Sequence, residues 1–340
     1  MMPINRRLKR ELKKNFAKYF FIGLVLFMGI TIISAFFTAT DGIVSTIESQ
    51  QSDCNIENAN VTLVSQLSDD NISRLHEIGI NDLEDTSYCD VTALDDSDYT
   101  MRVFRVRDSV DKLSLIEGEL PANDKQIVLE SKTASAKDLS VGDEIDVDGK
   151  NYTLSGIVAV VDYNNVLQTV SSGVSNLKTF GLGFVSKQAF DGLDSAKMTI
   201  QYSLTAEDEQ SIDDAYNYLM DEEIAVNILK QSDNPRIKSI SDKTNTLKAE
   251  VTLISVVFVL LMVFIFYAMT SASVEKDSNL IGTFFSMGYT RWEIIQHYVR
   301  LPLIITLIGS VLGMITGSLL FAEPIGKITY STYSLPDRQT

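Results

Sequence analysis

Few residues in this 340-residue chain are of the types that do chemistry. The chain has two histidines and two cysteines, which are His76, His297, Cys54 and Cys89. They form no HExxH or CxxC pattern, the spacings typical of zinc sites and redox thiols, and no GxSxG pattern marks a serine nucleophile. The sequence therefore predicts neither a metal site nor a catalytic residue.

A nucleotide-binding loop is also missing from the sequence. The P-loop pattern G-x-x-x-x-G-K-[ST] holds phosphates with its backbone amides. The segment closest to it ends at Gly149-Lys150, but Glu144 stands where the first glycine belongs, and Asn151 replaces the hydroxyl residue. We therefore predict that the chain is not an enzyme, binds no cofactor and cannot hydrolyse ATP by a P-loop of its own.

Three apolar blocks must position any functional residues of the chain. Charged residues are absent from 19–40, 251–274 and 301–322, although 22% of the whole chain is charged. A helix of about 20 apolar residues crosses a hydrocarbon layer of about 30 Å. We predict a membrane protein with three transmembrane helices, at 19–40, 249–274 and 301–322, and this excludes a soluble protein.

The positive charges predict how these helices are oriented. Residues 1–18 carry seven Lys and Arg against one acid, Glu11, and such basic flanks stay in the cytoplasm. The first block is also longer than the apolar core of a cleaved signal peptide, about 7–15 residues. We predict a multi-pass plasma-membrane protein with 1–18 and 275–300 in the cytoplasm and 41–248 and 323–340 outside.

The charge balance differs between these regions. Between Asp41 and Lys248, acids outnumber bases by 38 to 17, a net charge of −21, whereas the remaining segments together carry +5. A nucleic-acid partner is not expected, because phosphate binding needs a basic surface. The simplest interpretation of the acidity is solubility of the outer segment.

The outer segment 41–248 is predicted to fold as a large α+β domain. Strands are expected at 60–66, 99–106, 145–147, 152–161, 197–203 and 224–228, and helices at 68–78, 131–139 and 207–220. They mix without a regular βαβ order. The stretch 166–183, rich in Ser, Gly and Asn, is expected to be a mobile loop. A helix from 236 onward is favoured over a flexible linker into the second crossing.

Both cysteines fall in this outer segment, where disulfides form. A Cys54–Cys89 disulfide and a pair of buried free thiols are both compatible with the sequence. His76 and His297 fall on opposite sides of the membrane, so they cannot cooperate.

Large apolar side chains concentrate in the cytoplasmic loop. They are Phe284, Phe285, Met287, Tyr289 and Trp292. We predict a short helix that ends at Gly288 in the left-handed conformation, followed by a second helix that starts at a Thr290–Glu293 capping box. Two interpretations of the apolar groups remain open: contact with the lipid interface, or insertion into a groove of a partner protein.

The loop follows the pattern I-G-x-x-x-x-x-G-x-x-R-x-x-I, from Ile281 to Ile294. The outer segment also contains GELP at 118–121, QIVL at 126–129, VGD at 141–143 and YTLSGIV at 152–158. In this order, the motifs resemble the FtsX-like permease family of ABC transporters, which has the MacB-type architecture. The likeness extends over nearly the whole chain. It implies a bacterial membrane protein and a MacB-like core in 41–248.

The resemblance implies that 275–293 contains a coupling helix that docks on a separate ABC ATPase subunit, which uses the ATP. The residues expected to make this contact are Ile281, Gly282, Phe284, Phe285, Met287, Gly288, Tyr289, Arg291, Trp292 and Glu293. The chain would be a permease subunit that moves its outer domain to export a substrate. The alternatives are a signalling subunit that controls a cell-wall hydrolase or senses antimicrobial peptides, and a membrane-anchored binding or adhesion protein without an ATPase.

The resemblance also sets expectations about assembly. The family unit has four crossings, but 323–340 contains prolines and charges that exclude a fourth. The chain is therefore expected to be the first, N-terminal part of a longer permease or a truncated gene product. Its expected partners are a second permease half or a second copy, an extracytoplasmic protein and membrane lipid.

A stripe of small residues lies on one face of the third apolar block. It consists of Gly309, Gly313 and Gly317, which follow one another at intervals of four. Such a stripe lets two helix backbones approach closely in lipid. We predict a packing face, with three partners open: the first crossing, a fourth crossing or another permease half.

Overall fold

The computed structural model describes residues 12–13, 15–194 and 197–336. The chain divides into two compact units. Unit 1 contains the residues up to Ile43 and Thr244–Tyr330, and unit 2 contains Val44–Lys243 and the residues from Ser331 onward. Most of the predicted basic segment 1–18 lies outside the described residues.

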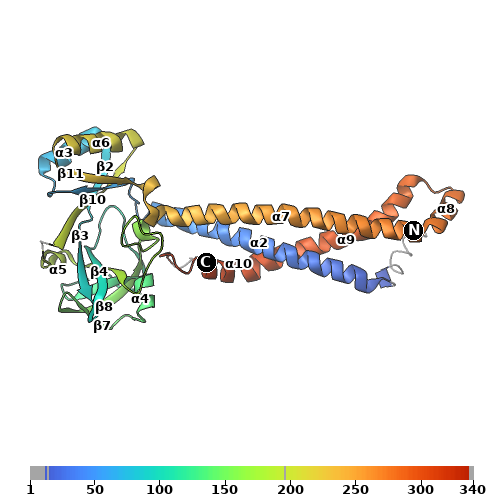
Figure 1. The fold of residues 1–340 in the computed structure, drawn as a ribbon, viewed down its shortest axis with the longest axis horizontal. Helices are drawn as coiled ribbons and strands as arrows, with labels where there is room; N and C mark the ends of the chain where they lie inside the picture. The colour runs from blue at the N-terminus through green and yellow to red at the C-terminus, as the bar shows by residue number, and fades with distance from the viewer. Residues whose placement is uncertain (1–11, 14, 195–196, 337–340) are drawn as a thin grey trace. The chain divides into compact units, whose positions relative to one another are not determined.

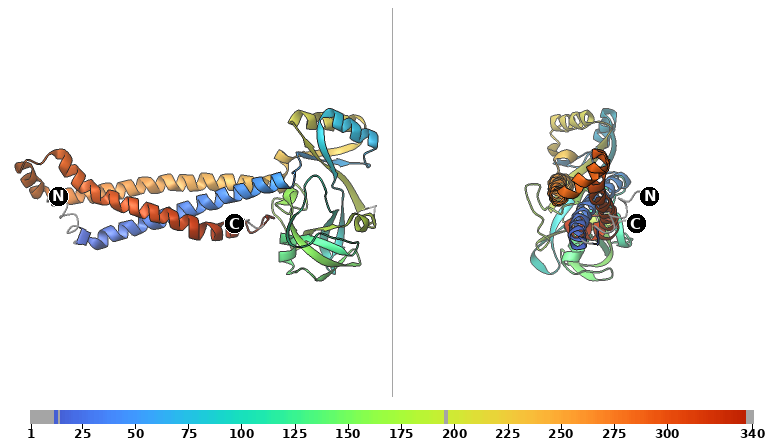
Figure 2. Two further views of the ribbon diagram at one scale, coloured as in Figure 1. Left: turned by 180° about the vertical axis from the view of Figure 1, so that it is seen from behind. Right: turned by 90° about the vertical axis from the view of Figure 1, so that its right-hand side faces the viewer.

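Unit 1 is helical. It is formed by parts of α2 (Phe16–Asp53) and α7 (Pro235–Lys276), together with α8 (Ser278–Ser286), α9 (Arg291–Thr316), a π-helical turn η4 (Gly317–Phe321) and α10 (Ala322–Thr329). Within unit 1 the long helices run side by side, and α8 lies at one end of the bundle (Figures 1 and 2). In lipid, a helix satisfies every backbone hydrogen bond internally, which is why these apolar runs fold this way.

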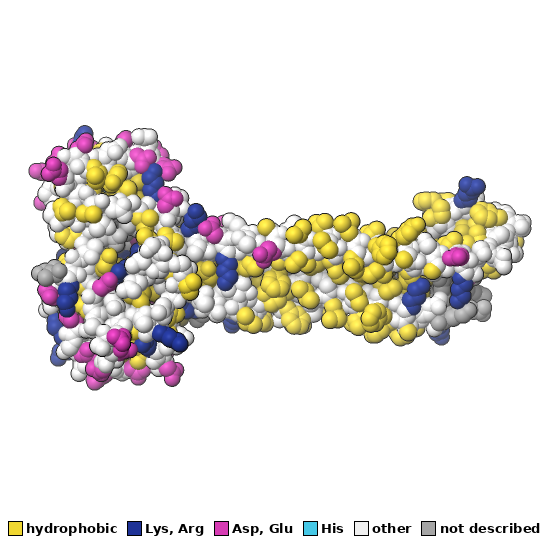
Figure 3. Space-filling view, in the orientation of Figure 1, with side chains coloured by type: hydrophobic (Ala, Val, Ile, Leu, Met, Phe, Trp, Pro, Cys, Tyr) yellow, Lys and Arg dark blue, Asp and Glu magenta, His cyan; other side chains and the backbone are white. Residues whose placement is uncertain are grey.

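Three helical segments are long and apolar enough to cross a membrane: Phe16–Asp53, Pro235–Lys276 and Arg291–Thr329. The prediction of three membrane helices is confirmed in this sense. Figure 3 shows apolar side chains along these helices and acidic side chains gathered on the strand-rich unit. The expected helix at 236–248 is confirmed as well, because α7 begins at Pro235 and continues to Lys276 without interruption.

The segment after the third apolar block contains a helix that the sequence did not predict. Residues Ala322–Thr329 form α10, in which Lys327 pairs with Glu323 at 2.8 Å. Helix α10 follows the π-helical turn η4 directly, and Pro324, which has no N–H to donate to the preceding turn, lies just after this irregular turn. The prolines and charges there argue against a membrane crossing, but they do not prevent a short helix.

Unit 2 consists of two lobes, and the first is a four-stranded antiparallel sheet. Its strands are β1 (Ala59–Leu63), β2 (Ile80–Asp85), β10 (Met198–Ala206) and β11 (Ala225–Lys230), in the order β11-β1-β10-β2. Helices α3 (Asp69–Ile78) and α6 (Glu209–Asp221) pack over it, with Leu75, Ile212 and Leu219 in the core (Figure 1). A Ser68–Asn71 capping box starts α3, and Gly79 in the left-handed region ends it.

The second lobe is a mixed sheet. Its strands are β3 (Tyr88–Ala93), β4 (Asp96–Arg105), β5 (Ser114–Gly118), β6 (Gln126–Glu130), β7 (Glu144–Val147), β8 (Lys150–Ala159) and β9 (Phe180–Val185). Strand pairs β4–β9 and β6–β8 are parallel, and the other pairs are antiparallel. Two short helices, α4 (Ser131–Ala136) and α5 (Lys187–Asp191), complete it. The α+β class is confirmed.

The prediction of a mobile loop at 166–183 is wrong at both of its ends. Val166 and Leu167 are buried, and every residue of β9, Phe180–Val185, is buried. A Cβ at Gly181 would collide with the Tyr99 hydroxyl and with Thr133. Glycine in this segment therefore serves close packing inside a sheet, not a loop.

The two cysteines are free and buried in separate surroundings, so the structure does not form the disulfide considered from the sequence. The Cys54 Sγ atom lies 3.1 Å from the Ser114 hydroxyl, whereas Cys89 belongs to the core of the second lobe. Burial raises the pKa of the Cys89 thiol to about 11, which keeps it protonated and unreactive at neutral pH.

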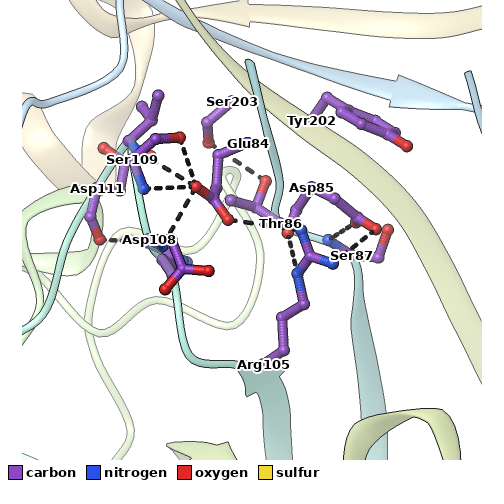
Figure 4. Close-up of polar contacts among 12 residues, drawn as sticks. Glu84, Asp85, Thr86, Ser87, Arg105, Asp108, Ser109, Asp111, Tyr202 and Ser203 are labelled. Carbon is purple, nitrogen blue, oxygen red and sulfur yellow. Dashed lines mark hydrogen bonds and ion pairs between the residues drawn. The ribbon is translucent and has the colours of Figure 1, made fainter. Parts of the chain in front are cut away.

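The two lobes are joined by β10 and by the link from β2 to β3. Strand β10 pairs with β2 through Tyr202–Ala206 and with β3 through Met198 and Thr199. At this junction the buried Glu84 carboxylate accepts hydrogen bonds from the Ser109 amide at 2.7 Å and the Ser109 hydroxyl at 2.6 Å (Figure 4). Charge-assisted bonds of this kind hold the two lobes in one arrangement.

Candidate functional site

The loop between the second and third long helices is built as a helix, a turn and a second helix. Helix α8 ends at Ser286, Met287 is its C-cap residue, and Gly288 follows with φ of 87°. The Gly288 amide donates to the Phe285 carbonyl at 3.0 Å, and the Tyr289 amide donates to the Phe284 carbonyl at 3.1 Å. The predicted left-handed conformation of Gly288 is confirmed, and it sets the direction in which the chain turns from α8 into α9.

A capping box starts the second helix, as predicted. The Glu293 carboxylate accepts from the Thr290 amide at 2.8 Å and from the Thr290 hydroxyl at 2.9 Å, and the Glu293 amide donates to the Thr290 hydroxyl oxygen at 3.4 Å. The box fixes where α9 begins. It therefore also fixes the orientation of the first residues of α9, which include Trp292.

Three large apolar side chains stand out from this helix-turn-helix. Phe285 is 46% exposed, Met287 58% and Trp292 66%. No residue of α8 is buried. Apolar side chains are visible at this end of the bundle in Figure 3. Covering an apolar surface of this kind with a partner protein or with lipid lowers the free energy.

Two of the predicted contact residues pack against each other. The Phe284 ring is half-buried and meets the Tyr289 ring edge-on, with 5.5 Å between the ring centroids. This pair packs across the turn and stabilises it. Ile281 and Glu293 are half-buried, whereas Gly282, Gly288 and Arg291 are exposed.

A hydrogen bond that the sequence analysis missed ties the loop to α9. The buried Tyr298 donates its hydroxyl hydrogen to the Asp277 carboxylate at 3.0 Å, and Asp277 lies immediately before α8. The start of α8 is therefore fixed on α9. A buried tyrosine usually needs a hydrogen-bond partner, but Tyr298 lies among the polar residues Gln296, His297 and Arg300, so its burial could not be predicted from the sequence.

The glycine stripe packs against α2. A Cβ at Gly309 would lie 2.8 Å from Leu26 Cδ2, and a Cβ at Gly313 would lie 2.8 Å from the carbonyl oxygen of Phe27. A Cβ at Gly317 would collide with the carbonyl oxygen of Thr31. Of the three partners left open by the sequence, the structure places the first predicted crossing on the stripe.

Hydroxyl groups extend this helix seam beyond the glycines. The Ser318 hydroxyl is 2.9 Å from the Ser34 hydroxyl and 3.0 Å from the Thr38 hydroxyl. Hydrogen bonds between small residues are typical of closely packed membrane helices. The seam between α2 and the α9–η4 region therefore combines backbone approach with polar contacts.

The described residues offer no arrangement for metal chemistry. Within residues 12–13, 15–194 and 197–336, no group of three or more His, Cys, Asp or Glu side chains is placed to hold a metal ion.

Comparisons with known proteins give one family match and several structural neighbours. Residues 252–336 match the family model described as FtsX-like permease C-terminal. A comparison with curated protein sequences gives no significant match.

The chain is also similar to three solved structures, which share little sequence with it. The extracellular domain of the ABC-type transporter YknZ from Gram-positive bacteria is 12% identical with a TM-score of 0.32, over 50% of this chain and 98% of that one. The periplasmic region of MacB from Actinobacillus actinomycetemcomitans is 10% identical with a TM-score of 0.32, over 57% and 92%. A permease domain from Porphyromonas gingivalis is 10% identical with a TM-score of 0.27, over 48% and 78%.

Proposed function

The chain carries an FtsX-like permease C-terminal domain at residues 252–336, and from this premise we propose that it is the non-catalytic permease subunit of an ABC transporter. A separate ATPase subunit would bind the loop around α8. Its ATP cycle would move unit 2, called the outer unit below, and so export a substrate. The observation that carries this proposal is the exposed apolar surface formed by Phe285, Met287 and Trp292 inside the matched region.

The geometry of the loop suits a mechanical contact. Helix α8 follows α7 after a single residue, and the Thr290 capping box leads directly into α9. A force applied to α8 therefore reaches two membrane helices through short, hydrogen-bonded connections. The three apolar blocks contain no Asp, Glu, Lys, Arg or His side chain that would line a polar path, which favours movement of the outer unit over transport through a pore.

The experiment that tests this function is copurification of an ATPase. The full chain, produced in its native membrane with an affinity tag, is expected to recover an ABC ATPase, and this complex is expected to support ATP-dependent efflux of a substrate. Recovery of the ATPase without efflux would replace the exporter with a signalling subunit. If no ATPase is recovered, the chain is an anchored binding protein and the proposal is wrong.

The proposed membrane topology is tested by thiol labelling of intact cells. Asn123 and Ser278 are both exposed side chains, so a cysteine at either position is reachable from the solvent around it. A membrane-impermeant maleimide is expected to label a cysteine at Asn123 or at Gln339 from outside, but not one at Ser278. Labelling at Ser278 in intact cells would place the loop outside the cytoplasm and would exclude the ATPase contact.

A further inference from the structure

In unit 2, two consecutive asparagines contact three segments that are far apart in sequence. Asn164 and Asn165, called the asparagine hub below, follow the short 3₁₀ helix η1 (Val161–Tyr163). They contact α2 at Gln50, α7 at Arg236 and Ser239, and the segment after α10 at Ser334. Each of these segments continues along the chain into a candidate membrane helix.

Asn164 joins the first and the last of these segments. Its Nδ2 atom donates to the Gln50 Oε1 atom at 3.0 Å and to the Ser334 carbonyl oxygen at 2.9 Å. The Ser334 amide donates back to the Asn164 carbonyl oxygen at 2.7 Å. The Val160 amide donates to the Ser334 hydroxyl oxygen at 3.2 Å. One side chain therefore bridges two segments that are more than 280 positions apart.

Asn165 holds the beginning of α7. Its amide donates to the Arg236 carbonyl oxygen at 2.9 Å, and its side chain donates to the Ser239 hydroxyl at 3.1 Å. The Arg236 guanidinium in turn donates to the carbonyl oxygens of Leu167 and Gln168, each at 3.0 Å. It also lies over the Tyr163 ring, 4.4 Å from its centroid. Residues before the hub (Tyr163) and after it (Leu167 and Gln168) therefore contact the beginning of α7, as Asn165 does.

These contacts are buried and therefore hard to exchange for water. Asn164 and Ser334 have no exposed surface, and Gln50 and Arg236 are also buried. A buried polar group that loses its partner bears a desolvation penalty, so the bonds that Asn164 Nδ2 makes to Gln50 and Ser334 favour one arrangement of these segments, although the buried Asn164 Oδ1 and Gln50 Nε2 atoms have no hydrogen-bond partner among the described residues. The hub segments are expected to move together, not to slide past one another.

We propose that the asparagine hub couples the outer unit to all three membrane helices. Asn164 is the positioning residue that joins α2 at Gln50 to the Ser334 segment, and Asn165 holds the beginning of α7. The inference rests on the proposed function, because it names the residue through which movement of the helices reaches the outer unit. The segment around Ser334 is then a third attachment of the outer unit, in addition to α2 and α7. Alanine at position 164 removes the donor that joins Gln50 to Ser334.

The test measures attachment of the Ser334 segment directly. In the purified full chain in detergent, Ser334→Cys places a thiol where the serine is fully buried, so labelling by a maleimide is expected to be slow. Adding Asn164→Ala is expected to raise the labelling rate about tenfold, because two buried hydrogen bonds are lost. Asn176→Ala, a change of the same kind at an exposed asparagine, is the matched control and is expected to leave the rate unchanged. An unchanged rate in Asn164→Ala would overturn the attachment.

Folding is monitored in the same samples through Cys89, which is buried in the second lobe. If Asn164→Ala exposes Cys89, the variant is unfolded, and Gln50→Ala then takes its place. Gln50→Ala removes one of the two side-chain hydrogen bonds of Asn164 and leaves the segment that contains Asn164 unchanged. Faster labelling at Ser334→Cys in the Gln50→Ala protein would support the hub. Labelling as slow as in the parent would contradict it.

Coupling is tested in the complex with the ATPase. A non-hydrolysable ATP analogue is expected to change the labelling rate at Ser334→Cys in the parent, and Asn164→Ala is expected to abolish this response while ATPase recovery stays the same. A response that survives in Asn164→Ala would mean that the hub only holds the segment in place, and the coupling role would be wrong. Failure of the parent to recover any ATPase would refute the proposed function, whereas the labelling comparison without ATPase would still decide the attachment.

Discussion

Replacing Gly317 with leucine is expected to separate the third long helix from the first and to prevent stable assembly of the helical unit. The added Cβ would collide with the Thr31 carbonyl oxygen and would lie 3.0 Å from both the Ala35 amide nitrogen and the Ser34 Cβ. Two of these three atoms are backbone, which cannot rotate away as a side chain can. Overpacking in a close-packed region costs about 1–3 kcal/mol, and a backbone obstacle places Gly317→Leu at or above the upper end.

The measurement is oxidative crosslinking in native membranes between cysteines at Ser34 and Ser318, whose hydroxyls are 2.9 Å apart. Gly317→Leu is expected to abolish the crosslink. Gly313→Leu should act in the same way, since its Cβ meets the Phe27 carbonyl oxygen at 2.8 Å, and Gly309→Leu should be milder because its obstacle is a Leu26 methyl group. Leu319→Trp adds bulk at a highly exposed position of the same segment and is the control. If Gly317→Leu crosslinks as well as the parent, the seam is absent from the membrane.

The elements that the sequence predicted correctly are those with local signals. A run of residues without charge marks a membrane helix on its own, and the Thr290–Glu293 capping box needs only two side chains three positions apart. No contact with the rest of the chain is needed to predict these features.

The features that were missed depend on contacts between distant residues. Gly181 looked like a loop residue because its neighbours in sequence are small, but its role is set by Tyr99 and Thr133 across the sheet. The packing of Phe284 against Tyr289 was not predicted, because the Tyr289 ring reaches Phe284 only after the chain turns at Gly288. The asparagine hub joins positions 50, 164, 236 and 334, and no local pattern connects them.

Removing the three exposed apolar side chains of the α8 loop is expected to cause the largest loss of partner binding. Full burial of one such side chain is worth about 1.5–3 kcal/mol, which is about a tenfold to hundredfold change in affinity. Trp292→Ala alone should weaken recovery of the ATPase by about this factor. Combined with Phe285→Ala and Met287→Ala it should reduce binding by about a thousandfold or more, because the burial energies of three exposed side chains are then lost together.

The decisive comparison is with an aromatic residue that is equally exposed but lies in the predicted hydrocarbon layer. Phe264 on α7 is 69% exposed, close to the 66% of Trp292. Phe264→Ala is expected to leave ATPase recovery unchanged, since lipid covers that position. Phe284→Ala removes the packing against Tyr289 and should weaken binding indirectly, through loss of the turn. If instead the triple variant keeps the ATPase but no longer inserts into the membrane, the three side chains contact lipid. In that case the loop is an interfacial anchor, because burial in a protein groove would have to show itself in the affinity for that protein.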